Sequence, residues 1–181
     1  MSNPTIEVGS VLRPYDLVTL RGERLRIPDA ERLVHLQFRR FAACPICNLH
    51  LRSVVARHDE IVATGVREVV VFHSPADAMR PHQGDLPFAT IPDPEKTLYA
   101  EFGVGTSPLA VLDPRVWGTI ARAVAQPRPR GTSIKADGGS FGLPADFLIA
   151  RDGRVVARKY GVHADDQWSV DELLALARGG N

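Results

Sequence analysis

The sequence predicts one α/β domain, in which helices cover both faces of a mixed central sheet and a hairpin precedes the sheet. Three observations predict it. Strand-like and helix-like segments alternate through the first half of the chain, two strand-like segments flank an Asp-Gly turn in the second half, and 181 residues is the length of one domain. The alternation implies parallel strands joined by right-handed crossovers, and the later hairpin adds antiparallel strands. We take residues 1–181 as a single domain with its core at about residues 16–178.

The first half of the chain supplies the hairpin and the parallel strands. Residues 16–27 alternate around Arg21-Gly22, which is typical of a short hairpin, and residues 34–41 alternate between apolar and polar side chains as a strand does. Residues 45–64 have apolar side chains at helical spacing, with a proline in the first turn and a glycine at the end. The β-branched residues 66–72 predict a buried central strand.

The second half supplies further helices and the antiparallel strands. We expect a helix from residue 74, a strand at 88–91, helices at 95–102 and 113–125, and a loop at 126–142 that is rich in proline, glycine and arginine. Asp152-Gly153 separates the strand-like residues 145–150 and 154–160 and is the strongest short hairpin signal in the chain. Residues 171–178 predict a last helix, with Ser169 as its cap.

Composition excludes several classes of function. Hydrophobic residues make up 44% and charged residues 24% of the chain, and the net charge is +1, so there is no strong field to attract nucleic acid or an acidic membrane. No stretch approaches the ~20 apolar residues that span a bilayer. Residues 1–13 are polar and lack the apolar region of a secretory signal, so we expect a cytoplasmic protein.

The chain has only two cysteines, Cys44 and Cys47, three positions apart. A disulfide-stapled secreted scaffold would distribute several cysteines along the chain. The favoured interpretation is a redox pair. A structural metal site is an alternative, although no second Cys-x-x-Cys or close histidine pair completes four ligands. Two inert buried cysteines are the other alternative, because free cysteine is common in cores.

The predicted helix explains why this pair would be reactive. Pro45 fits the first helical turn, so Cys44 falls at or next to the N-cap, where unpaired N–H groups and the helix dipole favour a thiolate. Cys47 lies one turn further on, a spacing at which a disulfide can form. We therefore expect Cys44 to attack and Cys47 to resolve the product.

These features resemble the thioredoxin-like superfamily, specifically peroxiredoxin-like members of the alkyl hydroperoxide reductase/thiol-specific antioxidant family. The resemblance rests on three blocks in this order: the strand with residues 44–51, residues 91–93 with 98–104, and residues 142–149 with 152–155. It implies a thioredoxin-like fold and a thiol oxidoreductase that needs no cofactor. It also implies a peroxide or protein disulfide as the oxidant, an external thiol of the thioredoxin or glutathione type as the reductant, and a possible homodimer.

The resemblance also implies a substrate site around the cysteines. We expect a cis peptide at Leu143-Pro144, opposite the cysteine pair, so that a substrate main chain can dock nearby. Pro45 and Phe41 complete the expected substrate-binding set.

The sequence departs from the peroxiredoxin pattern at two positions before Cys44. Typical members carry proline seven residues before the peroxidatic cysteine and threonine or serine three residues before it, whereas this chain has Gln37 and Phe41. Phe41 has no hydroxyl to bond a thiolate or peroxide, so the pair resembles a dithiol exchange centre. A non-catalytic thioredoxin-like binding module is a further alternative. Candidates for the family's arginine are three, each expected at the surface: Arg39, Arg40 and Arg115.

The predicted helix at 113–125 looks like an insertion relative to thioredoxin. We expect its side chains Trp117, Ile120 and Val124 to pack as core or lid, with a dimer contact as the alternative.

Overall fold

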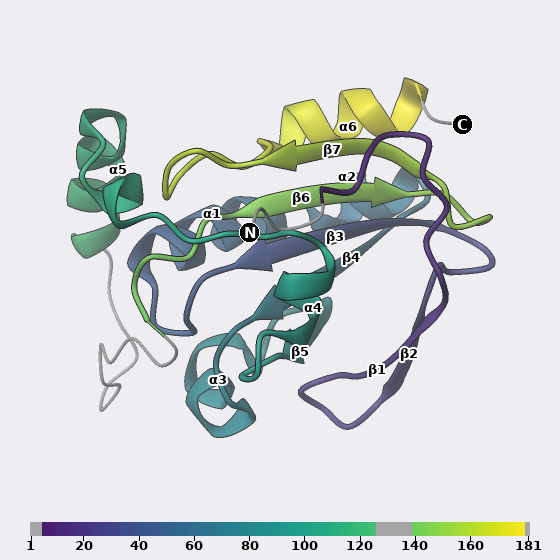
Figure 1. Ribbon diagram of the computed structural model, residues 1–181, viewed down its shortest axis with the longest axis horizontal. Coiled ribbons are helices and arrows are strands. Elements are labelled where there is room, and N and C mark those ends of the chain that lie inside the picture. Colours follow the sequence, from purple (N-terminus) through teal and green to yellow (C-terminus); the bar gives the residue numbers. More distant parts are fainter. Residues whose placement is uncertain (1–4, 126–138, 180–181) are drawn as a thin grey trace.

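The computed structural model of the chain describes residues 5–125 and 139–179 (Figure 1). Most of the predicted loop at 126–142 therefore lies outside the described residues. Residues 139–141 are irregular as expected, and Gly142 forms an isolated bridge with Thr106. Within the described part of the chain, no helix is both long and apolar enough to cross a membrane.

The central sheet has five strands in the order β5-β4-β3-β6-β7. β3, β4 and β5 run parallel, whereas β6 pairs antiparallel with both β3 and β7. This mixed sheet confirms the predicted fold class. The strands are β3 (Leu33–Arg39), β4 (Val66–Phe72), β5 (Ala89–Pro92), β6 (Ala145–Ile149) and β7 (Val155–Tyr160).

The predicted N-terminal hairpin forms a separate two-stranded sheet. β1 (Tyr15–Val18) pairs antiparallel with β2 (Arg24–Ile27), and Gly22 in the turn has φ 83°. That left-handed conformation suits glycine, which explains the Arg21-Gly22 signal.

The α-helices follow the prediction with one division, and the 3-10 helix η1 is an addition. The stretch predicted as one helix is two, because Arg57 has φ −121° and ψ 21° and interrupts the helical backbone. Ser169 caps the last helix through a reciprocal pair of bonds with Glu172. The helices are α1 (Pro45–Ala56), α2 (His58–Ala63), α3 (Ala76–Gln83), α4 (Thr97–Glu101), the 3-10 helix η1 (Pro108–Val111), α5 (Pro114–Val124) and α6 (Val170–Gly179).

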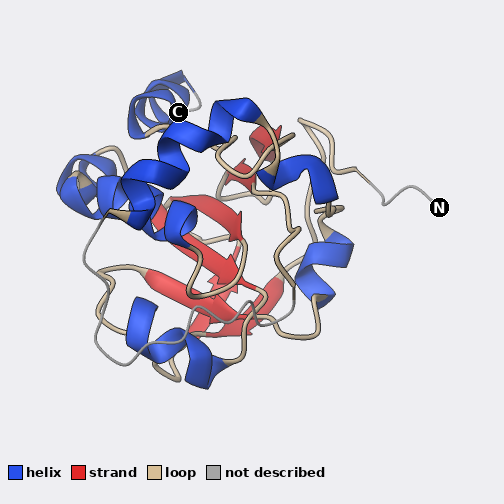
Figure 2. Ribbon diagram, turned by 90° about the vertical axis from the view of Figure 1, so that its left-hand side faces the viewer, coloured by secondary structure: helices blue, strands red, loops and turns tan. Residues whose placement is uncertain are grey.

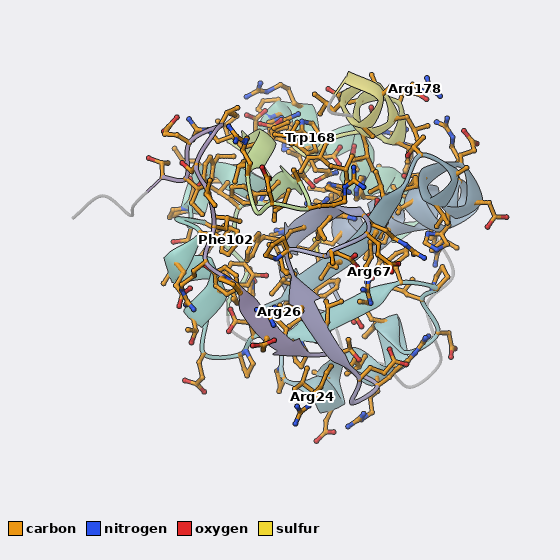
Figure 3. All side chains as sticks on the ribbon, turned by 90° about the vertical axis from the view of Figure 1, so that its right-hand side faces the viewer. Arg24, Arg26, Arg67, Phe102, Trp168 and Arg178 are labelled. Atoms are coloured by element: carbon orange, nitrogen blue, oxygen red, sulfur yellow. The ribbon has the colours of Figure 1, made fainter. Side chains whose placement is uncertain are left out.

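Both faces of the central sheet are covered (Figure 2). One face packs side chains of α1, α2, α3 and α6 into a core that includes Leu51, Ile61 and Leu173. The other packs α4, the hairpin and the segment before it around Phe38, Phe102 and Phe147. In Figure 1 α4 lies in front of the sheet and α1 behind it. Figure 3 labels Phe102, which belongs to the core on the α4 side, and Trp168, which belongs to the core on the α1 side.

Candidate active site

The two cysteines lie at the end of β3 where α1 begins. Cys44 is the N-cap residue of α1, with Pro45 in the first helical position, as the sequence predicts. The Cys44 Sγ accepts a hydrogen bond from the backbone N–H of Cys47 at 3.3 Å. Both cysteines are free thiols. A sulfur that caps a helix faces its unpaired N–H groups, which favours negative charge on the pair.

Arg40 supplies a full positive charge to the same sulfur. Its Nη2 donates to the Cys44 Sγ at 3.0 Å, and its Nη1 donates to the carbonyl of Ser140 at 3.1 Å. Only 3% of Arg40 is exposed. The guanidinium is therefore fixed beside the thiols, in surroundings where a charge acts more strongly than in water.

The two thiols share one negative charge. Burial opposes ionisation of Cys47, but the hydrogen bond from Cys44 and the charge of Arg40 outweigh it and lower the Cys47 pKa to about 6. Burial, reinforced by the hydrogen bond and charge of Cys47, raises the pKa of Cys44. The hydrogen bonds that the Cys44 Sγ accepts from Arg40 and from the α1 backbone favour the negative charge on Cys44 instead. We conclude that the first proton leaves the pair readily and the second is retained, because two adjacent buried anions repel each other.

Both sulfurs are covered by other parts of the protein. Cys44 is 0% and Cys47 is 3% exposed. The cover is α5, whose Val116 packs with Phe41, Ile46 and both cysteines. The Thr119 hydroxyl donates to Asp165 Oδ2 at 2.6 Å and holds α5 against the segment after β7. Figure 1 shows α5 at the left, where α1 begins.

The predicted buried face of α5 is wrong by about one residue. Val116, Thr119 and Ala123 face inward, whereas Trp117 is 62% and Val124 is 52% exposed. Ile120 is partly buried against the cysteine cluster, as expected. The helix is placed as a lid, but its tryptophan points away from the molecule. The patch that α5 covers, around the two cysteines, accommodates the small inward side chains of α5, and the Trp117 ring stays on the solvent side.

The expected cis bond at Leu143-Pro144 is wrong. Among the described residues the cis peptide is Ile27-Pro28. The Leu143 N–H donates to Gly105 at 3.1 Å, and the Pro144 carbonyl accepts from Gly161 at 2.9 Å. Main-chain bonds on both sides thus hold this segment in the extended trans form that leads into β6, and trans is the ordinary state even before proline.

The segment before Pro144 nevertheless lies beside Arg40, which contacts the Cys44 sulfur. A Cβ on Gly142 would lie 3.2 Å from the His73 Nε2 and 3.4 Å from the Arg40 Cγ. Phe41 is 7% exposed in the cysteine cluster. The structure therefore places Phe41, Pro45 and Arg40 around Cys44, with residues 140–142 behind Arg40.

Of the three candidate arginines, two are buried and one is not. Arg40 contacts Cys44, and Arg39 is 0% exposed, so the expectation that both lie at the surface is wrong. Arg115 is exposed and pairs with Asp113 at 2.7 Å. Arg115 therefore has no part in the thiol site.

Sequence reasoning missed a buried polar network on the α1 face of the sheet. His35 Nδ1 lies 2.9 Å from Glu68 Oε2, and its Nε2 lies 3.1 Å from Asp146 Oδ1. Arg39 Nη2 donates to the same Asp146 oxygen at 2.7 Å. Gln37 joins the network through Glu68 and Arg39. The alternation of the β3 sequence was a signal for these side chains, but it did not show which charged residues of β4 and β6 they meet.

The network ends against α1. The Arg39 Nη2 lies 3.2 Å from the His50 Nε2. Burial and the charge of Arg39 lower the His50 pKa to about 3, so His50 is neutral and accepts this bond. His50, expected as a surface residue, is partly buried.

Charges within the network stabilise one another. Burial opposes protonation of His35, but the Glu68 charge and the bond to Asp146 raise its pKa to about 9. Burial works against the Asp146 carboxylate as well, yet Arg39 and His35 lower its pKa. The structure therefore holds two cations, Arg39 and His35, with two carboxylates in the protein interior.

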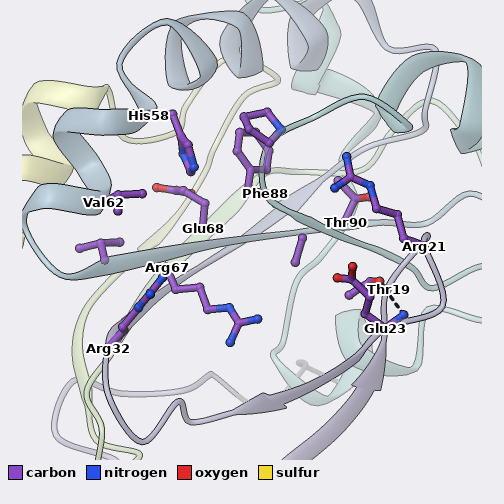
Figure 4. A pocket seen from close by; sticks show the side chains of 13 residues that line it. Thr19, Arg21, Glu23, Arg32, His58, Val62, Arg67, Glu68, Phe88 and Thr90 are labelled. Carbon is purple, nitrogen blue, oxygen red and sulfur yellow. Dashed lines mark hydrogen bonds between the residues drawn. The ribbon is translucent and has the colours of Figure 1, made fainter.

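A cavity of about 190 Å³ lies at the other end of the sheet (Figure 4). Its lining includes His58, Phe88, Arg32, Arg67 and Glu68, of which Arg67 and Glu68 belong to the first half of β4. Because the cysteines follow the last residue of β3, and β3 runs parallel to β4, this cavity is remote from the thiols. We do not assign the thiol chemistry to it.

Comparisons with known proteins agree with this architecture. The family model described as AhpC/TSA antioxidant enzyme matches residues 51–163. The chain belongs to this family. The matched residues begin after both cysteines, so the thiol pair itself lies outside the match. No curated protein sequence matches the chain.

Solved structures similar to this AhpC/TSA family member include both peroxiredoxins and disulfide exchange proteins. Peroxidoxin BcpB from Mycobacterium tuberculosis has a TM-score of 0.69 and 17% identity, covering 96% of this chain and 97% of that one. A peroxiredoxin-like protein from Aquifex aeolicus has a TM-score of 0.65 and 15% identity, covering 99% and 91%. A putative thiol:disulfide interchange protein DsbE from Chlorobium tepidum has a TM-score of 0.61 and 18% identity, covering 96% and 99%. At these identities the similarity establishes the peroxiredoxin-like, thioredoxin-type fold.

Proposed function

We propose that the protein is a thiol-dependent oxidoreductase, a peroxiredoxin-like antioxidant in which Cys44 attacks a peroxide or a disulfide and Cys47 resolves the product. The observation that carries the proposal is the Arg40 Nη2 held 3.0 Å from the Cys44 Sγ at the start of a helix. A fixed cation and helix N–H groups stabilise a thiolate, which is the reactive form of cysteine.

With a peroxide, the cycle has two steps. The Cys44 thiolate attacks one peroxide oxygen, the O–O bond breaks, and the departing alkoxide or hydroxide takes up a proton while Cys44 becomes a sulfenic acid. The Cys47 sulfur then attacks the Cys44 sulfur, and the hydroxyl leaves as water with one proton. An external thiol of the thioredoxin or glutathione type reduces the resulting disulfide, so the cycle needs no further cofactor.

Arg40 suits the first step in particular. Its Nη2 faces the sulfur, and its other terminal nitrogen is bonded to the Ser140 carbonyl, so the guanidinium stays in place while charge moves from sulfur to oxygen. A preorganised donor of this kind stabilises the developing negative charge in the transition state. We therefore assign to Arg40 the role of the family's arginine, for which the sequence offered three candidates.

Dithiol-disulfide exchange is a second candidate, and Phe41 favours it. Phe41 packs in the cysteine cluster at the position where peroxiredoxins carry a hydroxyl, so no side chain there can bond a peroxide oxygen. A disulfide sulfur does not need that donor, because the leaving group is a thiolate. Recycling by an external thiol suits a reducing compartment, and we therefore propose a cytoplasmic setting.

Either reaction requires α5 to move, because it covers both sulfurs. Thr119 and Asp165 hold the lid in place. Movement of such a helix is the ordinary way in which an enzyme admits a substrate to a covered site.

The test compares three oxidants on the reduced protein: hydrogen peroxide, an organic hydroperoxide and an oxidised protein disulfide. Stopped-flow tryptophan fluorescence follows oxidation, and mass spectrometry identifies the products. Cys44→Ser should abolish turnover with every oxidant. Cys47→Ser should stop at a sulfenic acid or a mixed disulfide after one turnover, and these two products separate peroxidase from exchange activity.

The matched control is the double variant Cys44→Ser/Cys47→Ser, which contains no cysteine at all. Full activity of Cys44→Ser would refute the assignment. Failure of the reduced wild-type protein to react with any of the three oxidants would instead support a non-catalytic binding module.

A further inference from the structure

Arg39 and Arg40 are consecutive buried arginines at the end of β3, shortly before the cysteine pair. Arg40 donates directly to the Cys44 Sγ. The side chain of Arg39 points to the α1 face of the sheet, where it meets Asp146 and the His50 ring. No step of the proposed cycle has used Arg39 so far.

The position of Arg39 follows from the helix it touches. His50 lies three residues after Cys47 on α1, and residues at that spacing share one face of a helix. Arg39 approaches the His50 Nε2 to 3.2 Å, so its guanidinium lies against the first turns of α1 on the Cys47 side. It is completely buried, and water does not screen its charge there.

Asp146 holds Arg39 from behind. In the pairing of β3 with β6, Asp146 lies opposite Gln37, two residues before Arg39 and further from the cysteines. Its Oδ1 is 2.7 Å from Arg39 Nη2, and both side chains are 0% exposed. In the strand register, the positive member of this ion pair is therefore the one nearer to the cysteines.

We propose that Arg39, anchored by Asp146, is a positioning residue for the resolving step: once Cys44 has been oxidised, the buried charge of Arg39 favours the anionic form of Cys47, which then attacks the Cys44 sulfur. This inference rests on the proposed function, because it needs Cys47 to attack the Cys44 sulfur. It divides the two steps between two arginines, with Arg40 serving the attack by Cys44 and Arg39 serving its resolution by Cys47.

The electrostatic surroundings of Cys47 agree with this division. Burial, the largest effect, opposes ionisation of Cys47. Four other interactions together lower the Cys47 pKa: the hydrogen bond from Cys44, the charge of Arg40, the Arg40 backbone and the charge of Arg39. The Tyr99 phenol also interacts with the Cys47 charge: burial, followed by that charge, raises the pKa of Tyr99, so it stays neutral. The cover from α5 and the segment after β7 includes the apolar side chains Val116, Ile120 and Ala164, together with the hydrogen-bonded pair Thr119 and Asp165.

A chromogenic disulfide, dithiobis(nitrobenzoic acid), separates the two steps without any peroxide. In the first phase the Cys44 thiolate attacks the reagent, a mixed disulfide forms and one nitrothiobenzoate anion leaves. In the second phase the Cys47 thiolate attacks the Cys44 sulfur, the Cys44–Cys47 disulfide forms and the second anion leaves. The rate of the second phase against pH reports the ionisation of Cys47.

Arg39→Gln removes the charge and keeps a donor for Asp146. We expect the pH midpoint of the second phase to rise by about one unit, and its rate below the midpoint to fall about tenfold. The first phase should change less than about twofold, because Arg40 remains. Arg39→Lys restores a positive charge and should bring the midpoint back towards the wild-type value.

Asp146→Asn provides a change of opposite sign. It removes a negative charge and leaves Arg39 charged, so the midpoint should stay or fall. A purely structural role would slow both variants in the same way, and it would not move the midpoints apart. The matched control is Arg67→Gln, which removes a charge from the early part of β4, beside Asp29; it should leave both phases unchanged.

An unchanged midpoint in Arg39→Gln, or a rise of equal size in Asp146→Asn, would overturn the inference. If Arg39→Gln does not fold, the other two variants still decide it: a midpoint that stays or falls in Asp146→Asn and is retained in Arg39→Lys supports the inference, and a rise of about one unit in either overturns it. A wild-type protein that releases only one nitrothiobenzoate would contradict the resolving role of Cys47 and hence the proposed function itself. Two phases in the wild type that do not respond to Arg39 would contradict this inference alone.

Discussion

The two faces of the central sheet have cores of opposite character, although they are built from neighbouring residues of the same strands. On one face the Phe38 ring lies 5.0 to 5.9 Å, centroid to centroid, from Tyr99, Phe102 and Phe147. On the other, under α1 and α6, the flanking residues Gln37 and Arg39 belong to the charged network. Every residue of β3 is buried, so the alternation of its sequence separates two interiors and not an interior from solvent.

The difference teaches how each face responds to change. Aromatic contacts are individually small and share the stabilisation among many atoms, so the loss of one contact is partly compensated. A buried ion network depends on each member, because removal of one group leaves the others charged and without a partner. The polar face is therefore the more sensitive one, and it is also the face that reaches Cys47.

The largest expected effect follows from Asp146→Ala. This change removes the acceptor of Arg39, of His35 and of the Trp168 backbone N–H, and it leaves two buried cations with one carboxylate. We expect the free energy of unfolding to fall by about 3–5 kcal/mol, measured by urea denaturation.

The matched control is Asp77→Ala, at a side chain that is 96% exposed, which should change the free energy of unfolding by less than about 0.5 kcal/mol. A loss at Asp146 no greater than at Asp77 would mean that the network does not stabilise the fold.

Sequence reasoning predicted the strands that carry this network but not the network. The alternating β3 segment, the β-branched β4 segment and the Asp-Gly hairpin fixed the strands, and Pro45 fixed Cys44 at the helix start. The contact of His35 with Asp146 joins residues 111 positions apart and depends on β6 lying next to β3. Local sequence patterns do not show which strands lie next to each other in the sheet. They also do not show which face of α5 turns inward, because hydrophobicity favoured Trp117 where the lid uses Val116.

A smaller effect should appear in the pH dependence of stability. The His35 pKa is about 9 in the folded protein, above its ordinary value of 6.5. Because the native state binds this proton more tightly, the stabilisation is fully present below about pH 6.5 and is lost as the pH rises through about 9. The loss should reach at most about 3 kcal/mol.

This measurement requires the double variant Cys44→Ser/Cys47→Ser. The lowered pKa of Cys47 acts with the opposite sign, since its contribution is lost as the pH falls through about 6. Thermal unfolding of this background at several pH values should be compared with the same background carrying His35→Gln. Parallel curves for the two proteins would show that His35 carries no proton-linked stability.

The smallest effect concerns the aromatic face, at Phe147→Leu, the residue next to Asp146. The Phe147 ring contacts Phe38, Phe102 and Tyr160 at centroid distances of 5.9, 5.1 and 5.4 Å. Leucine keeps most of the apolar contact and loses the edge-to-face geometry, so we expect a loss of about 1–2 kcal/mol. No charge changes, so urea denaturation at about pH 6 and about pH 9 should give the same loss. The second phase of the dithiobis(nitrobenzoic acid) reaction should also keep its wild-type midpoint. A pH-dependent loss, or a shifted midpoint, would show that the two faces are coupled through the sheet, and the separation between a packing face and a thiol-tuning face would then not hold.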